Sequence, residues 1–166
     1  MTKREETTLV TIKEFANKLP KFPDGRIDYS SSNIAPVITV FLKYKDKILL
    51  LKRSTRVRTY QGKWNTVAGY LDEVKPIYEK ITEETQEELG LNENNISLVH
   101  IGKPYKFIDT EINKTWIIHP VLIELKNKPT IELDWEHTEY KWVKPEEIKD
   151  FDTVPNIDKS LKNASK

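Results

Sequence analysis

The chain contains no cysteine, which excludes disulfide bonds, thiolate metal ligands and cysteine nucleophiles. No apolar run approaches the ~18 residues that a membrane helix needs. The charged N-terminal stretch MTKREETT is not followed by the apolar core of a secretory signal. Neither charge is in excess, since 27 Lys and Arg residues oppose 26 Asp and Glu residues, and this balance indicates no nucleic-acid partner. We therefore expect a cytoplasmic protein without a membrane segment or a disulfide-linked partner.

The balanced total combines two oppositely charged segments that follow one another. Residues 41–66 contain eight basic side chains and one acidic one, Asp46, whereas residues 72–93 contain eight acidic side chains and two basic ones, Lys75 and Lys80. The basic residues of the first segment are Lys43, Lys45, Lys47, Lys52, Arg53, Arg56, Arg58 and Lys63. Most charge runs are solvated surfaces, so the pattern alone leaves a structural and a functional interpretation open.

Hydrophobic periodicity predicts an α+β fold. A helical spacing covers residues 9–19 and a loop continues to residue 33, so residues 1–33 form an N-terminal extension to a main domain of residues 34–166. The strongest strand signals, VITVFLKY and KILLLKR, predict a hairpin. Further strands are predicted at 64–71, 96–99, 106–108, 116–124 and 140–143, and helices at 76–89, 145–149 and 157–161. Helices at both ends of a strand-rich middle indicate one mixed sheet flanked by helices.

The helix predicted at 76–89 has clear ends and an unusual distribution of charge. Pro76 suits the first turn, and Gly90 suits the position after the last turn, where a positive φ is needed. On a helical projection, Glu84, Glu87 and Glu88 fall within an arc of ~100°, and Glu88 lies inside the apolar stripe. A solvated charged face would lie opposite that stripe.

Three carboxylates beside an apolar stripe repel one another unless a cation neutralises them. A solvated helix would carry Lys at the i,i+4 partner positions, whereas Glu79, Glu83 and Glu87 form a like-charged series. Carboxylate oxygens suit Mg²⁺ or Mn²⁺. The basic loop that precedes the helix then suits a phosphate substrate, with the metal between phosphate and carboxylates.

The segment from Gly69 to Leu91, GYLDEVKPIYEKITEETQEELGL, resembles the Nudix box. The positions that match its spacing are Gly69, Glu84, Glu87, Glu88, Gly90 and Leu91. The flanking stretches ILLLKRS, GKWNTVAGYL and WEHTEYKWVKPEEI resemble Nudix proteins as well, so the resemblance covers roughly residues 34–161. It implies an α/β/α sandwich with a central mixed sheet.

Three positions depart from the Nudix box. Lys75 stands where the box has its first Glu, Glu83 where it has Arg, and Thr85 where it has an aliphatic residue. The first two departures are a charge reversal at constant spacing. We predict that Lys75 and Glu83 form a reversed ion pair that holds the loop onto the helix; the alternative is that the function of the box has decayed.

The resemblance implies roles for further residues. Glu84, Glu87 and Glu88 would bind the divalent metal with help from the backbone carbonyl of Ala68 or Gly69. Glu84 would also be a candidate catalytic base. Family members often use a Glu from a distal loop as well. In the stretch DWEHTEY the best candidate is Glu136, which would complete the metal site or activate water, although a plain surface residue is the alternative. For the neighbouring His137, a structural role is favoured over a catalytic one.

Substrate contacts are predicted from the basic loop and from aromatic side chains. An arginine fork matches two phosphate oxygens, and Arg53, at the end of a strand, is better placed than Arg56 or Arg58. The aromatic candidates for stacking on a base are Trp64, Tyr105, Phe107 and Trp116, each with a core role as its alternative. His100 and His119 lie within or beside apolar runs and are predicted to be structural.

The resemblance implies metal-dependent hydrolysis of a phosphoanhydride bond in a nucleoside diphosphate-linked substrate or a nucleoside triphosphate. The second hypothesis is a nucleotide-binding or regulatory protein of the same fold with little or no hydrolysis, which Lys75 and Glu83 favour and the retained Glu84, Glu87 and Glu88 oppose. Isomerisation of isopentenyl diphosphate ranks low, because that chemistry usually needs a cysteine. Homodimers are frequent in the family, and the sequence leaves the oligomeric state and the substrate open.

Overall fold

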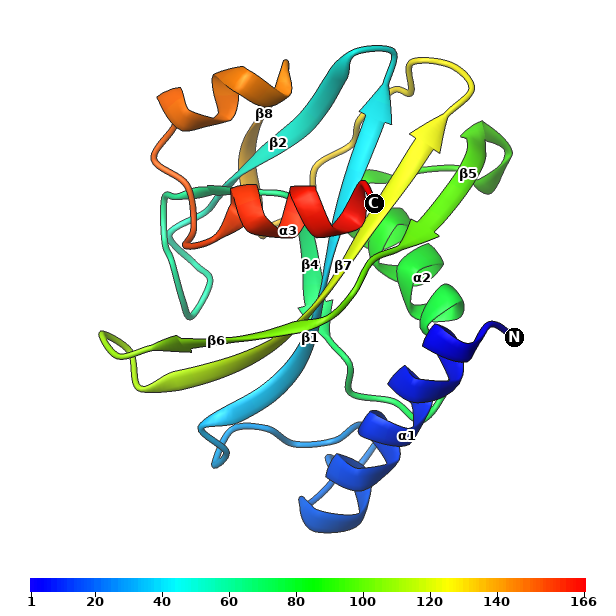
Figure 1. Cartoon of the computed structure of the whole chain (residues 1–166). Helices are drawn as coiled ribbons and strands as arrows, with labels where there is room; N and C mark the ends of the chain where they lie inside the picture. Colours follow the sequence, from blue (N-terminus) through cyan, green and yellow to red (C-terminus); the bar gives the residue numbers. More distant parts are fainter.

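The computed structural model describes the whole chain, residues 1–166. Its elements are α1 (Lys3–Lys18), β1 (Ile34–Tyr44), β2 (Lys47–Arg53), β3 (Trp64–Asn65), β4 (Val67–Tyr70), α2 (Ile77–Leu89), η1 (Glu93–Asn95), β5 (Ile96–Ile101), β6 (Tyr105–Asp109), β7 (Lys114–Leu125), β8 (His137–Val143), η2 (Pro145–Asp150) and α3 (Ile157–Ala164). The helices lie around one mixed sheet, as predicted (Figure 1). No helix combines the length and the hydrophobicity that crossing a bilayer requires.

The centre of the sheet is the parallel pair of β1 and β7. The predicted hairpin of β1 and β2 is present, but these strands share register only at its tip, where Lys43 pairs with Ile48 and Tyr44 with Lys47. Beyond the tip they take different partners, since β1 pairs with β4 while β2 pairs with β3 and β8. The two parts of the sheet therefore diverge, and the candidate site described below lies where they separate.

Each face of the sheet buries its own hydrophobic cluster. Successive residues of β1 alternate between the faces, so Val40 and Leu42 join the cluster covered by α1 and α2, whereas Phe41 joins the one covered by η2 and α3. This gives three layers, with the sheet between helices.

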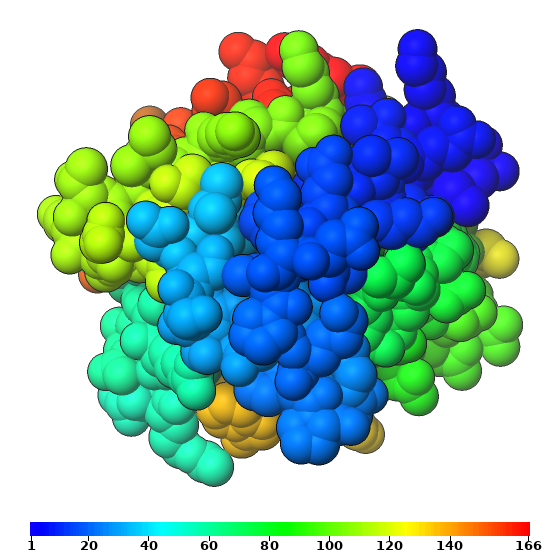
Figure 2. Space-filling model, turned by 90° about the horizontal axis from the view of Figure 1, so that it is seen from below, coloured from blue at the N-terminus to red at the C-terminus, as the bar shows by residue number.

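The N-terminal segment contributes to the first of these clusters. Ile12 and Ala16 of α1 and Tyr29 of the following loop are buried there, and the Tyr29 hydroxyl donates a hydrogen bond to the Leu71 carbonyl (2.7 Å). Figure 2 shows this segment, in blue, spread over one end of the molecule beside the green residues that lead into α2. The division at residues 33 and 34 into extension and domain stays a prediction.

The structure corrects three predicted elements. The first helix begins at Lys3 and not at Leu9, because Thr2 and Glu5 form a capping box, a sequence signal that the apolar spacing does not contain. The strand predicted at 64–71 is divided into β3 and β4 at Thr66, whose hydroxyl donates to the Val40 carbonyl (2.6 Å). The segment predicted as a short helix at 145–149 is a 3₁₀ helix.

Candidate active site

Helix α2 presents the acidic side chains, and its ends form as the sequence predicts. Pro76 stands at the N-cap, and Gly90 adopts the left-handed conformation with φ 69° at the C-cap. The amide of Gly90 donates to the Gln86 carbonyl (2.8 Å) and that of Leu91 donates to the Thr85 carbonyl (3.3 Å). These bonds end the helix at Leu89, one residue after Glu88, which fixes the position of its last acidic turn.

The backbone of β4 lies directly against Glu84. A Cβ added at Gly69 would lie 2.8 Å from Glu84 Cδ, closer than real Cβ contacts occur. A larger residue at position 69 would therefore displace this carboxylate from its present place. The predicted backbone ligands, Ala68 and Gly69, thus lie beside the predicted side-chain ligand Glu84.

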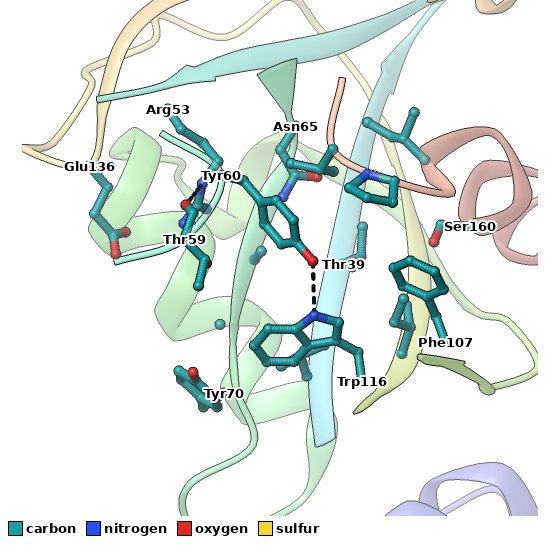
Figure 3. A pocket seen from close by; sticks show the side chains of 17 residues that line it. Thr39, Arg53, Thr59, Tyr60, Asn65, Tyr70, Phe107, Trp116, Glu136 and Ser160 are labelled. Atoms are coloured by element: carbon teal, nitrogen blue, oxygen red, sulfur yellow. Dashed lines mark hydrogen bonds between the residues drawn. The ribbon is translucent and has the colours of Figure 1, made fainter. Parts of the chain in front are cut away.

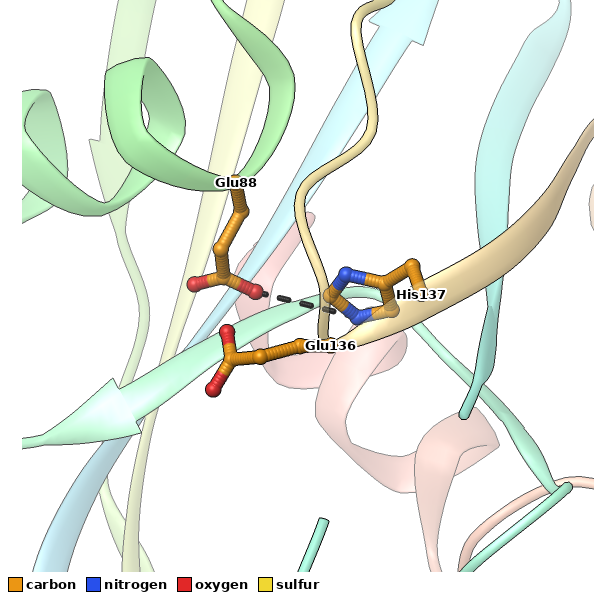
Figure 4. Close-up of side chains that lie close together, drawn as sticks. All are labelled: Glu88, Glu136 and His137. Carbon is orange, nitrogen blue, oxygen red and sulfur yellow. Dashed lines mark ion pairs between the residues drawn. The ribbon is translucent and has the colours of Figure 1, made fainter. Parts of the chain in front are cut away.

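Glu136 reaches the same place from the loop before β8, and Figure 4 shows it facing Glu88. The loop is shaped by Asp134, whose Oδ1 accepts a hydrogen bond from the Glu136 amide (3.1 Å). The serine after β2 holds it too, because the Ser54 amide donates to the Glu136 carbonyl (2.7 Å). The structure thus brings Glu84, Glu88 and Glu136 together from separate parts of the sequence.

The electrostatics of this cluster oppose its ionisation. Glu88 is 2% exposed, and burial, reinforced by Glu84 and Glu136, raises the pKa of its carboxyl well above the ordinary value. Burial first, and then Asp134 and Glu84, raise the pKa of Glu136 to about 7. Burial and Glu84 also raise the pKa of Glu87, which is itself exposed at the rim. The cluster therefore lacks positive charge.

A divalent cation fits this donor set. Glu88 Oε2 is buried and has no hydrogen-bond partner, and neither ring nitrogen of His137 has one. One ligand atom each from Glu88, Glu136 and His137 lie within 4.8 Å of one another. Carboxylate oxygens, with an imidazole nitrogen beside them, are ordinary ligands of divalent metals.

Two lysines supply part of the missing positive charge. Lys75 pairs with Glu83, which confirms the predicted ion pair with reversed charges, and its Nζ lies 3.3 Å from Glu73 Oε1. Lys80, only 7% exposed, lies with its Nζ 2.8 Å from Asp72 Oδ1 and 3.2 Å from Glu84 Oε1.

Lys80 is the residue that the sequence reasoning missed. The like-charged series of Glu79, Glu83 and Glu87 suggested a helix without lysine partners, whereas Lys80 and Glu84 do form an i,i+4 pair. The spacing was visible in the sequence, but the burial of Lys80 beside Ile77 and Ile81 was not.

A pocket of about 170 Å³ opens beside the carboxylates, where β1 and β2 diverge. Arg53, Gly69 and Glu136 form its end nearest α2, and Phe107 and Trp116 line it further away (Figure 3). Its wall includes a hydrogen-bonded series: Trp116 Nε1 donates to the Tyr60 hydroxyl (3.0 Å), which donates to Asp109 Oδ2 (2.6 Å). The Asn65 amide also lines the pocket, although its backbone belongs to β3.

The structure distributes the predicted substrate contacts unevenly. Arg53 lines the pocket, with its Nε donating to the Thr59 carbonyl (3.0 Å). Arg58 is exposed outside the lining, and Arg56 lies over the ring of Trp135, 5.5 Å from its centroid. The arginines of the basic loop thus separate, and only Arg53 reaches the pocket.

Two of the four aromatic candidates lie elsewhere. Trp64 contacts Phe151 with ring centroids 5.2 Å apart, beside the cluster under α3. Tyr105 does not line the pocket itself, but its hydroxyl is hydrogen-bonded to Oγ of Ser160 (2.5 Å), which does. Both rings are held by packing or hydrogen bonds that the local sequence does not encode, and their contact with substrate stays a prediction.

The other two histidines are held by main-chain carbonyls, as expected of structural residues. His100 Nδ1 lies 2.6 Å from the Ala164 carbonyl oxygen. His119 is buried, and its Nδ1 lies 3.2 Å from the Val37 oxygen. His137 differs from both, because its ring nitrogens have no such partner.

Comparisons with known proteins agree with this geometry. The family model described as NUDIX domain matches residues 33–164. A curated relative, the nucleoside triphosphatase NudI of Klebsiella pneumoniae (strain 342), is 25% identical over 125 residues, which cover 70% of this chain and 86% of the relative.

Solved structures share the fold. The MutT protein from Methanosarcina mazei Go1 superposes with a TM-score of 0.64 at 24% identity, covering 80% of this chain and 93% of that one. An Ap4A hydrolase from C. elegans superposes with a TM-score of 0.62 at 18% identity, covering 79% and 95% respectively. A MutT NUDIX hydrolase from Burkholderia pseudomallei superposes with a TM-score of 0.62 at 18% identity, covering 78% of this chain and 97% of that one. These likenesses confirm the predicted α/β/α sandwich.

Proposed function

The chain belongs to the Nudix family, and from this premise we propose that it is a divalent-metal-dependent hydrolase of phosphoanhydride bonds in nucleotides. The observation that carries the proposal is the carboxylate pair of buried Glu88, which has an unpaired oxygen, and half-buried Glu136, which lines the pocket. Burying such a pair is costly without a cation. The likeness to a nucleoside triphosphatase favours nucleoside triphosphates among the substrates, with nucleoside diphosphate-linked compounds as the other class.

Glu84, Glu87 and Glu88 would hold Mg²⁺ or Mn²⁺, with a backbone carbonyl of Ala68 or Gly69. The cation, when bound, neutralises charge on the phosphate oxygens and lowers the pKa of water. Glu84 lies against Gly69 and is held by Lys80 at 3.2 Å, so its carboxylate has a fixed place from which to accept the proton of an attacking water. Glu136 faces Glu88 from the opposite loop and closes the set of carboxylates.

Arg53 is the residue of the basic loop that we assign to phosphate. Its guanidinium lines the pocket at the carboxylate end, and its Nε bond to Thr59 holds the plane of the group. An arginine fork held in this way binds two phosphate oxygens at once. The remainder of the substrate then occupies the pocket toward Phe107 and Trp116.

A substrate screen with matched variants tests this function. Nucleoside and deoxynucleoside triphosphates, nucleotide sugars and dinucleoside polyphosphates are each incubated with Mg²⁺ or Mn²⁺, and released products are separated by chromatography. We expect turnover that needs the metal and that is lost in Glu87→Gln. Glu79→Gln is the control, because Glu79 is an exposed glutamate of the same helix. Metal-dependent turnover that Glu87→Gln retains in full would contradict the assigned site.

The second candidate function is nucleotide binding without hydrolysis. It is favoured by the reversed charges of Lys75 and Glu83 and by the ion pair that Lys80 forms with Glu84. The same screen separates the two, because a binding protein would give no Glu87-dependent turnover on any substrate. It would still show saturable, Mg²⁺-dependent nucleotide binding by calorimetry.

A further inference from the structure

His137 is buried beside the carboxylates without a hydrogen-bond partner for either ring nitrogen. Its side chain is 1% exposed, and both Nδ1 and Nε2 are unpaired, as is Glu88 Oε2. Buried polar atoms in proteins are nearly always paired, so His137 Nε2 and Glu88 Oε2, which lie close together without partners, call for a ligand. Figure 4 shows the ring of His137 directed toward Glu88, with Glu136 alongside.

The spacing of these groups suits a shared ion. His137 Nε2 lies 3.7 Å from Glu88 Oε1, and one ligand atom from each of Glu88, Glu136 and His137 lie within 4.8 Å of one another. Ligand atoms that each lie about 2.1 Å from one ion are at most about 4.2 Å apart. A small rotation of one side chain therefore closes the cluster around a cation.

A bulge near the start of β8 sets the direction of His137 relative to the rest of the strand, while Glu136 belongs to the loop before it. Side chains of consecutive strand residues normally point to opposite faces. Here Lys52 pairs with Glu139 but Arg53 pairs with His137, so Thr138 is left over and the register shifts. Such bulges redirect side chains next to functional sites.

Asp134 lies on the other side of the ring. Its Oδ1 is 3.4 Å from His137 Nδ1 and also accepts the hydrogen bond from the Glu136 amide. A carboxylate beside one ring nitrogen holds the proton there and leaves the lone pair of the other nitrogen free, the arrangement found behind metal-ligating histidines. In this geometry the free nitrogen is Nε2, which faces Glu88.

We propose that His137 Nε2 is a metal ligand, giving a mixed nitrogen and oxygen site with Glu88 and Glu136. This deepens the proposed function, on which it rests, by naming the class of cation. A nitrogen donor favours divalent transition metals such as Mn²⁺, Fe²⁺ or Co²⁺ over Mg²⁺, which takes oxygen ligands. The site therefore binds Mn²⁺ more tightly than Mg²⁺, and His137 supplies the difference.

Electron spin echo spectroscopy of bound Mn²⁺ tests this ligand directly. The full chain is loaded with one equivalent of Mn²⁺, and nitrogen modulation from a coordinated imidazole is recorded in protein with natural histidine and with ¹⁵N-histidine. We expect a ¹⁴N signal that changes to the ¹⁵N pattern on labelling and disappears in His137→Gln. We also expect His137→Gln to lower the Mn²⁺ association constant by about tenfold or more, with a smaller loss for Mg²⁺.

The chain offers a matched control. His100→Gln removes a histidine bonded to the Ala164 carbonyl and leaves the site intact, so the nitrogen signal persists. The inference is overturned if the wild type binds one equivalent of Mn²⁺ and shows no nitrogen modulation from imidazole. It is also overturned if that modulation persists in His137→Gln. In either case Mg²⁺-dependent turnover of a nucleoside triphosphate still supports the proposed hydrolase. Absence of both Mn²⁺ binding and turnover in the wild type overturns both proposals.

Discussion

The two ends of the candidate site are stabilised in opposite ways. At the carboxylate end, Glu88 and His137 are buried with unpaired polar atoms. At the pocket end, Trp116, Tyr60 and Asp109 form a series in which each polar group named has its partner. The first end therefore has unpaired polar groups that a cation would pair, while the polar groups of the second are paired within the chain.

From this difference we expect the carboxylate end to contribute mainly to catalysis and the pocket end mainly to substrate binding. Charges held apart from water interact strongly, and catalysis gains most from electrostatic groups that are already in place. A wall whose polar groups are already hydrogen-bonded to one another contributes shape and modest binding energy. Removing a carboxylate at the first end should thus greatly lower the rate but raise the stability of the metal-free protein. Substitutions at the pocket end should have small effects on both rate and stability.

The largest effect is expected for Glu88→Gln. It removes one charged ligand, so kcat/KM should fall by about 10³-fold or more, since a bound metal contributes several kcal/mol. In EDTA at neutral pH, the variant should unfold at a higher temperature than the wild type, because Gln avoids the cost of a buried carboxyl. Kinetics and thermal melts measure the two effects. A variant with near-normal kcat/KM would remove Glu88 from the site.

The next largest effect contrasts two lysines. Lys80→Met leaves Glu84 without its basic partner and Asp72 with Arg26 alone, 3.8 Å away. The side chains of Lys80 and Glu84 are only 8% and 14% exposed, so the pair is largely shielded from water. Breaking such a pair should lower the free energy of unfolding by about 3 kcal/mol. Lys75→Met is the matched control, because Glu83 is 44% exposed and the loss should stay below about 1 kcal/mol. Urea denaturation compares them, and equal losses would refute the contrast.

The pH dependence of stability is a third test of the carboxylate end. The pKa of Glu136 is raised from 4.5 to about 7, so between these values the folded chain holds a proton that the unfolded chain has released. The free energy of unfolding of the metal-free protein should therefore fall as pH rises from about 4.5 to about 7. The raised pKa of Glu88 acts in the same direction. Saturating Mn²⁺ should flatten the profile, because the cation stabilises the ionised carboxylates.

Most of the acidic end could be predicted because it lies in one continuous segment. The helix limits at Pro76 and Gly90, the convergence of Glu84 and Glu88, and the ion pair of Lys75 with Glu83 follow from spacing along a helix. The burial of Lys80 did not follow, because lysine is rarely buried and only the packing of α2 under the sheet places it there.

The pocket end was predictable only in part. Its walls come from β1, β6, β7 and the segment around α3, and they meet because β1 pairs in parallel with β7 over ten positions. No local pattern encodes that pairing, so Trp64 and Tyr105 could not be separated from Phe107 and Trp116. The bulge at Thr138 is equally invisible in the sequence, and it decides where His137 faces.

The smallest effect is expected at the pocket end, for Tyr60→Phe. The change removes the hydroxyl that accepts from Trp116 and donates to Asp109. Loss of these bonds, one of which is accepted by the buried carboxyl of Asp109, should cost about 2 kcal/mol of stability. KM should rise about fivefold while kcat stays within about twofold, because one hydrogen bond contributes about 1 kcal/mol and the carboxylates are untouched. Steady-state kinetics on the best substrate from the screen measure both constants, with Tyr140→Phe, an exposed tyrosine, as the control. A fall in kcat like that of Glu88→Gln would show that the two ends act as one unit.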